Sequence, residues 1–196
     1  GVIIAETSKE KLLDSIYGNV TSNLQSNGRG GALSTNFTKT NSNGWYYKFQ
    51  GTLKRMGDFE TPKYAMTNTG FSEHNFSFKA GLNRIDHGFD IYYSLFSNRL
   101  GILRSSHAHT AIDIINAIEN EIPHIIEDFS YNINIPRQKI SHNLLKLKAF
   151  KNFDFGKLVM RYDFQANDRK EFDIRRGDSR GKPALDLNLK THSLAF

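Results

Sequence analysis

The stretch Trp45-Tyr46-Tyr47-Lys48-Phe49-Gln50-Gly51-Thr52-Leu53-Lys54 decides the fold class. Its side chains alternate between a polar side and an apolar side, and the apolar side carries Trp45, Tyr47, Phe49 and Leu53. Successive side chains of a β-strand point to opposite faces, so this period of two predicts a strand with one apolar and one polar face. Its length also matches the roughly 9–11 residues with which a tilted strand crosses a bilayer.

The same alternation recurs along the chain, in about eight segments altogether. The apolar positions of the other segments are Ile16, Val20 and Leu24; Leu33 and Phe37; Phe76, Phe78, Ala80 and Leu82; Phe89, Ile91, Tyr93 and Leu95; Leu145, Leu147 and Ala149; Leu158, Met160, Tyr162 and Phe164; and Leu185, Leu187 and Leu189. The sequence also holds 15 Phe and 8 Tyr against 4 Pro, which favours strands. We therefore predict an all-β, antiparallel, up-and-down fold.

Short and long connections alternate between these segments. The short ones are 41–44, 83–88 and 152–156, and the long ones are about 56–74, 98–139 and 167–183. Outer-membrane barrels have short periplasmic turns and long extracellular loops, so this alternation favours a transmembrane barrel segment. In the longest loop, Ala111, Ile114, Ile115 and Ile118 stand at helical spacing before Pro123, which predicts a short helix.

Composition narrows the classes of function. The 196 residues include no cysteine, which excludes disulfides and thiolate metal sites. The formal net charge is +6, but the basic residues are dispersed, so we expect no nucleic-acid partner. Mean hydropathy is −0.51, as an average over lipid-facing and lumen-facing positions allows. The start at Gly1 lacks the features of a signal peptide, and we interpret it as the interior of a longer protein.

Several short motifs carry a resemblance to a known family. They are Gly1-Val2-Ile3-Ile4-Ala5-Glu6-Thr7, Tyr17-Gly18-Asn19-Val20, Gly57-Asp58-Phe59-Glu60-Thr61-Pro62, Tyr92-Tyr93-Ser94, and Glu171-Phe172-Asp173-Ile174-Arg175-Arg176. In this order, across essentially the whole chain, they resemble the TonB-dependent outer-membrane receptors typical of Bacteroidota. The energy-coupling box and most of the plug of that family are not found here, which indicates a fragment.

The resemblance implies the organisation of the chain. Residues 1–10 would be the last strand of the plug domain and its linker, and residues 11–196 the N-terminal part of the barrel. The expected structure is an open curved sheet of about eight strands with long extracellular loops, cut from a barrel of about 22 strands.

The resemblance also implies a function in the bacterial outer membrane. Such receptors bind a scarce nutrient, such as an iron chelate, outside the cell and import it with energy from TonB. The implied partners are TonB (through the missing N-terminal part), the nutrient and outer-membrane lipid. Because the mechanism involves no covalent chemistry, we expect no enzyme activity, no catalytic residue and no cofactor.

Candidate ligand-binding residues lie in the long loops. Arg104, His107 and His109 fall in the longest loop, and Arg175 and Arg176 in the last one. Paired arginines suit a carboxylate or phosphate, and imidazoles can contact a ligand directly. The alternative is ordinary polar loop surface. We expect no metal site, because no cysteine or carboxylate stands at ligand spacing from the two histidines.

Three further motifs have plain interpretations beside functional ones. Trp45, Tyr47 and Phe49 fit either an aromatic girdle at the membrane interface or ordinary strand packing. Asp58 and Glu60 lack the surroundings for acid–base catalysis, so we expect both carboxylates to be solvated in a loop. The run 28–31 is glycine-rich, but no strand–helix context follows it, which predicts a hairpin turn.

Two other functions remain open at this point. Eight strands can close into a small outer-membrane structural or adhesin-like barrel, in which the first and last strands pair. A soluble enzyme or lectin-like β-domain would need a catalytic or metal-binding set of residues, and the apolar side of its strands would pack beneath a second protein layer.

Overall fold

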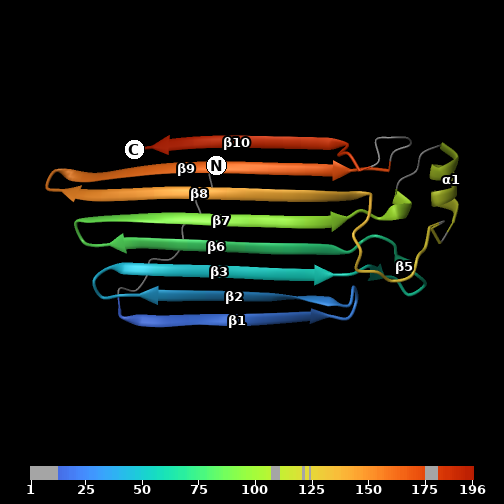
Figure 1. The fold of residues 1–196 in the computed structure, drawn as a ribbon, viewed down its shortest axis with the longest axis horizontal. Coiled ribbons are helices and arrows are strands. Elements are labelled where there is room, and N and C mark those ends of the chain that lie inside the picture. Colours follow the sequence, from blue (N-terminus) through green and yellow to red (C-terminus); the bar gives the residue numbers. More distant parts are fainter. Residues whose placement is uncertain (1–12, 107–110, 121, 124, 175–180) are drawn as a thin grey trace.

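Eight of the strands form one antiparallel sheet (Figure 1). This computed structural model describes residues 13–106, 111–120, 122–123, 125–174 and 181–196. The strands of the sheet, in spatial order, are β1 Ser15–Gln25, β2 Gly30–Thr40, β3 Trp45–Met56, β6 Phe71–Asn83, β7 His87–Gly101, β8 Arg137–Phe153, β9 Gly156–Phe172 and β10 Leu185–Ala195.

Each strand of this sheet pairs with the next one along the chain. The predicted all-β, antiparallel, up-and-down order is therefore confirmed. β1 and β10 lie at the two edges, and they pair with β2 and β9 only. In the part of the chain that is described, the sheet is open.

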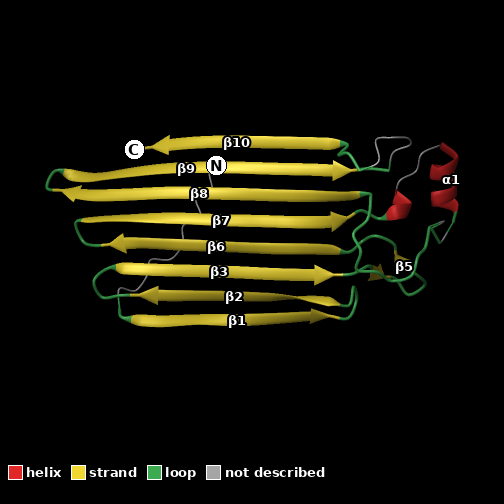
Figure 2. Ribbon diagram, viewed as in Figure 1, coloured by secondary structure: helices red, strands yellow, loops and turns green. Residues whose placement is uncertain are grey.

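The connections are sorted between the two ends of the sheet (Figure 2). The turns 41–44, 84–86 and 154–155 lie at one end, and the connections 57–70 and 102–136 lie at the other. The first long connection holds the two-stranded hairpin of β4 Phe59–Glu60 and β5 Ala65–Met66. The second holds the 3-10 helix η1 Arg104–Ser106 and α1 Ala111–Glu119, so the predicted short helix is confirmed. No described helix has the length and apolar character needed to cross a membrane.

The β1–β2 connection is a tight turn at the long-loop end. The backbone N–H of Arg29 donates to the carbonyl of Ser26 at 3.0 Å. Gly28 and Arg29 both have positive φ, at 80° and 43°, a conformation that glycine adopts without strain. The glycine-rich run is thus a hairpin turn, as its sequence predicts.

The pairing register separates two faces. We call one the apolar face; its central row of direct cross-strand partners from β2 to β9 is Phe37, Phe49, Phe78, Tyr93, Leu145 and Phe164. The other, the polar face, has the row Thr38, Lys48, Lys79, Tyr92, Lys146 and Asp163. From β2 to β9, the apolar positions predicted for the single strands therefore lie on the same face of the sheet.

Strand β10 departs from this pattern. Leu187 is the direct partner of Arg169, and Leu189 that of Asn167, so these leucines lie on the polar face. Asp186, opposite Lys170, lies on the same side as the apolar face. The period of two in β10 is confirmed, but its phase relative to the other strands follows from the pairing with β9.

Four strands extend further than the alternation predicts, into segments expected to be loops. β6 begins at Phe71, β7 continues to Gly101, β8 begins at Arg137, and β9 continues to Phe172. In these extensions both faces are largely polar, so the sequence signal disappears while the backbone hydrogen bonds to the neighbouring strand continue.

Candidate functional site

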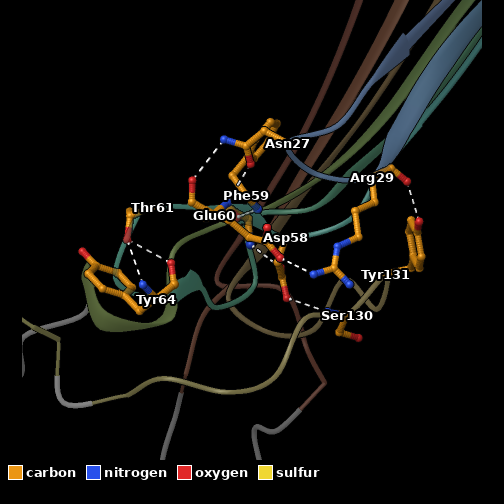
Figure 3. A network of polar contacts seen from close by, with 10 residues as sticks. Asn27, Arg29, Asp58, Phe59, Glu60, Thr61, Tyr64, Ser130 and Tyr131 are labelled. Carbon is orange, nitrogen blue, oxygen red and sulfur yellow. Dashed lines mark hydrogen bonds and ion pairs between the residues drawn. The ribbon is translucent and has the colours of Figure 1, made fainter.

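The two long connections pack against each other through a polar network at one end of the sheet. Asp58, which follows β3, is only 2% exposed. Its Oδ1 accepts the backbone N–H groups of Thr69 at 2.9 Å and Gly70 at 3.3 Å. Its Oδ2 accepts that of Ser130 at 3.2 Å (Figure 3). The backbone N–H of Asp58 in turn donates to the carbonyl of Ser130 at 2.9 Å. The prediction that Asp58 is solvated is therefore wrong, because its carboxylate joins two connections that lie far apart in the sequence.

Asn68 makes a second junction between the same connections. It is 4% exposed and has a φ of 66°, in the left-handed region that asparagine tolerates better than most residues. Its Nδ2 donates to the carbonyls of Ile102 at 2.8 Å and Pro136 at 2.7 Å, and its Oδ1 accepts the N–H of Asn134 at 2.7 Å. The side chain thus holds the beginning and the end of the longer connection together.

The β1–β2 turn attaches to the same cluster (Figure 3). The Arg29 guanidinium contacts the Glu60 carboxylate at 2.5 Å and stacks on the Phe129 ring with 4.1 Å to its centroid. Asn27 accepts the N–H of Glu60 at 2.7 Å and donates to its carbonyl at 3.0 Å. The Glu60 carboxylate is solvent-accessible, as expected, and it is also paired with Arg29.

Arg104 is the one predicted ligand residue that lies within the described part of the chain. Its Nη1 donates to the carbonyl of Ile135 at 2.7 Å, and its backbone N–H donates to the carbonyl of Thr67 at 3.0 Å. Arg104 therefore holds η1 against both connections. The other four predicted residues, His107, His109, Arg175 and Arg176, lie outside the described residues. So does the predicted plug strand, residues 1–10.

A small hollow at the tip of the β4–β5 hairpin is lined by Thr61, Pro62, Lys63 and Tyr64. Within the described ranges, no group of three or more His, Asp or Glu side chains is arranged to hold a metal ion. The cluster can therefore offer a ligand a rigid polar surface formed by three connections.

The apolar face is the second unusual feature. Phe49 is 43% exposed and Leu53 is 61% exposed, whereas buried hydrophobic side chains in the described ranges are few: Tyr46, Met56, Ile133 and Phe172. On β6 the apolar-face residues Phe76 and Phe78 are exposed, and the polar-face residues between and beside them are half-buried. The sheet therefore exposes its apolar side more than its polar side, the reverse of a sheet that forms one wall of a water-soluble core.

Trp45, Tyr47 and Phe49 lie together on the apolar face at the short-turn end of β3. The Trp45 and Tyr47 rings are stacked with centroids 6.4 Å apart, and Trp45 meets Phe89 of β7 edge-on at 5.7 Å. These rings form an exposed aromatic group without a protein layer over it in the described ranges.

On each strand the apolar face ends some distance before the loops. We call this end the stepped limit, because from β1 to β10 it shifts in steps toward the short turns. Apart from Phe172 at the loop end of β9, which is 9% exposed and lies under the Arg137 guanidinium, this face has one last large apolar residue on each strand. From β1 to β10 these residues are Leu24, Leu33, Leu53, Phe76, Leu95, Leu145, Phe164 and Leu194. Leu33 and Leu53 are direct partners, as are Phe76 and Leu95, and Leu145 and Phe164. Between these pairs, and at both edges, the limit shifts by two residues toward the short turns. At these four places the last large apolar residue of one strand is the direct partner of a glycine or a polar residue on the next strand. The partner pairs are Leu24 and Gly31, Leu53 and His74, Leu95 and Asn143, and Phe164 and His192.

Comparisons with protein-family models, curated proteins and solved structures return no match. The function is therefore argued from the geometry of the sheet and its loops.

Proposed function

We propose that this chain is part of a TonB-dependent outer-membrane receptor, which binds a scarce nutrient at its extracellular loops and imports it with energy from TonB. In this proposal the apolar face contacts lipid, the polar face contacts the barrel lumen, and the short turns lie on the periplasmic side. The observation that carries the proposal is the exposed apolar face with its stepped limit.

Exposure supports the lipid-facing orientation. Burying an apolar side chain in an apolar medium contributes roughly 25 cal/mol per Å² of surface removed from water, so an uncovered face of large apolar residues is unfavourable in water alone. Contiguous apolar surface of this kind marks a contact with protein or membrane. The polar face offers the amide, hydroxyl and ammonium groups that suit a water-filled lumen.

The stepped limit supports a tilted barrel wall. Strands of a barrel tilt against its axis, so the plane where lipid ends must cross the cross-strand rows obliquely. Along the strands, four steps of two residues shift the limit by about eight residues, or about 26 Å. Across the strands, the seven spacings from β1 to β10 add up to about 34 Å. The resulting slant of about 38° falls within the roughly 35–45° by which barrel strands tilt.

The loop cluster supports binding at the outer end. Its connections are fixed by buried polar side chains such as Asp58 and Asn68, so a ligand would meet a surface that is already ordered. Prior ordering lowers the entropic cost of binding. The identity of the nutrient would depend on this surface and on parts of the receptor beyond this chain.

Uptake measurements in cells that express the full protein containing this chain test the proposal. Accumulation of labelled iron chelates, cobalamin and glycans would be compared in cells with and without TonB, together with the amount of receptor in the outer-membrane fraction. We expect uptake of one class to fall to background without TonB while the receptor remains in the outer membrane. Absence from that fraction, or uptake independent of TonB, would contradict the proposal.

The alternative is a small eight-stranded outer-membrane barrel with a structural or adhesive role. Its specific support is the number of strands in the sheet, since eight can close on themselves. In that case β1 and β10 must pair. Because the chain has no cysteine, Thr21→Cys in β1 can be combined with Leu189→Cys, Thr191→Cys or Ser193→Cys in β10. Disulfide formation in membranes would support the closed barrel, and its absence in all three combinations would support the larger receptor.

A further inference from the structure

Three neighbouring basic side chains of β7 and β8 lie on the apolar side of the sheet, between the stepped limit and the loops. Arg99 of β7 is the direct partner of Lys139 of β8, and Arg137 of β8 lies opposite Gly101. We call Arg99, Arg137 and Lys139 the basic cluster. They come from two strands separated by the longest connection, so the sequence alone does not place them together.

Within the described ranges, the basic cluster has no ion-pair partner. Among the described residues, no carboxylate forms an ion pair with any of its three members. Neighbouring Lys170 differs, because it lies 3.6 Å from Asp186 and 3.9 Å from Asp168. Within the cluster, the positive charge of Arg137 repels Arg99, and the charges of both arginines repel Lys139. The three positive charges thus lie close together, and none of them is paired with a described carboxylate.

The two guanidiniums are also held in place with donors to spare. Arg99 Nη2 donates to the carbonyl of Ile133 at 2.6 Å, and Arg137 Nη1 reaches the same oxygen at 3.4 Å. Arg137 additionally stacks on Phe172, with 4.8 Å to the ring centroid. The Nε atoms of both arginines are buried and have no acceptor in the described ranges. Such unmet donors in a fixed position normally have an explanation.

We propose that the basic cluster binds the phosphate group of an anionic membrane lipid, whose acyl chains lie along the apolar face. Guanidinium groups present paired N–H donors that match phosphate oxygens, and the Lys139 ammonium adds a point charge. This proposal rests on the membrane orientation of the proposed function, because it places the cluster at the level of the outer-leaflet headgroups. It adds a specific lipid site to that orientation.

The neighbouring apolar residues favour a lipid over free phosphate. Leu95 lies on the same face of β7 as Arg99, four residues closer to the short turns, which is about 13 Å along the strand. Phe76 of β6 is the direct partner of Leu95. Leu145 of β8 lies two residues closer to the short turns than Asn143, the partner of Leu95 on that strand. An anion with an attached apolar tail therefore matches both the charge and the apolar surface that begins beyond Ser97, Ser141 and Asn143.

A charge-removing variant tests the proposal. The variant Arg99→Gln/Arg137→Gln/Lys139→Gln removes three charges and keeps an amide donor at each position. The matched control, Lys146→Gln/Lys148→Gln/Arg161→Gln, removes three charges from the polar face of β8 and β9. The full protein would be placed in phosphatidylcholine bilayer discs containing lipid A or lipid A stripped of its phosphate groups, and bound lipid counted by native mass spectrometry.

We expect the parent protein and the control to retain phosphorylated lipid A, and the triple variant to bind it at least about tenfold more weakly. All three should bind the dephosphorylated lipid equally, and inorganic phosphate should not displace the lipid. Unchanged affinity in the triple variant would overturn the lipid site, as would displacement by inorganic phosphate. If the triple variant enters the discs like its parent, failure concerns this site alone; a parent protein that enters no bilayer would overturn the proposed function as well.

Discussion

The apolar face and the loop cluster follow opposite rules within one chain. The face exposes large hydrophobic side chains such as Phe49 and Leu53, while the loop cluster buries polar ones such as Asp58 and Asn68. The loop cluster satisfies its buried groups internally, through hydrogen bonds that link distant connections. The apolar face depends on its surroundings for stabilisation. The two regions should therefore be destabilised by different changes. The loop cluster should be destabilised by loss of a hydrogen-bond partner, and the apolar face by introduction of a charge.

The largest expected effect follows from removing the Asp58 carboxylate. In Asp58→Ala, three N–H groups, one of them buried and two partly buried, lose their acceptor, and we expect the free energy of local opening of the loops to fall by about 3–5 kcal/mol. Hydrogen exchange of the amides of Thr69, Gly70 and Ser130 measures this change. Asp58→Asn, which keeps one acceptor oxygen, should lose about half as much. Unaltered protection of these amides in Asp58→Ala would contradict the assigned role.

An effect of intermediate size is expected on the apolar face. Phe49→Arg places a charge where the proposal has lipid, and should destabilise the protein in a bilayer by about 2–4 kcal/mol. Gln50→Arg is the matched control, because the next residue of β3 lies on the polar face and should cost less than about 1 kcal/mol. Unfolding by denaturant from lipid vesicles gives both values. Equal losses for the two variants would remove the distinction between the faces.

The smallest effect is expected at the rim of the loop cluster. Arg29 and Glu60 are solvent-accessible, so the coupling between them should be only about 0.2–1 kcal/mol, and it should decrease as salt is added. A double-mutant cycle with Arg29→Gln and Glu60→Gln measures it through hydrogen exchange of the β4–β5 hairpin. A coupling much larger than this, or one insensitive to salt, would indicate that the pair belongs to the buried part of the cluster.

The extent of prediction from sequence differs between the same two regions. All eight main strands were predicted from their alternation, because a period of two is a local property of the chain. The burial of Asp58 is not predicted from the sequence, because its partner Ser130 lies 72 residues away and no local sequence pattern indicates their contact. The strand extensions at Phe71 and Phe172 were missed for a related reason: pairing continues there although alternation ends.

By itself, the sequence determined which residues share a face of each strand and where the chain turns, since both depend on neighbouring residues alone. Only the tertiary structure decided the relative phase of the strands, because register is a relation between strands. The stepped limit of the apolar face, the reversed leucines of β10 and the meeting of Arg99, Arg137 and Lys139 all depend on that register. A shift of one residue in the pairing would exchange the two faces of a strand, so these features exist only once the sheet has formed.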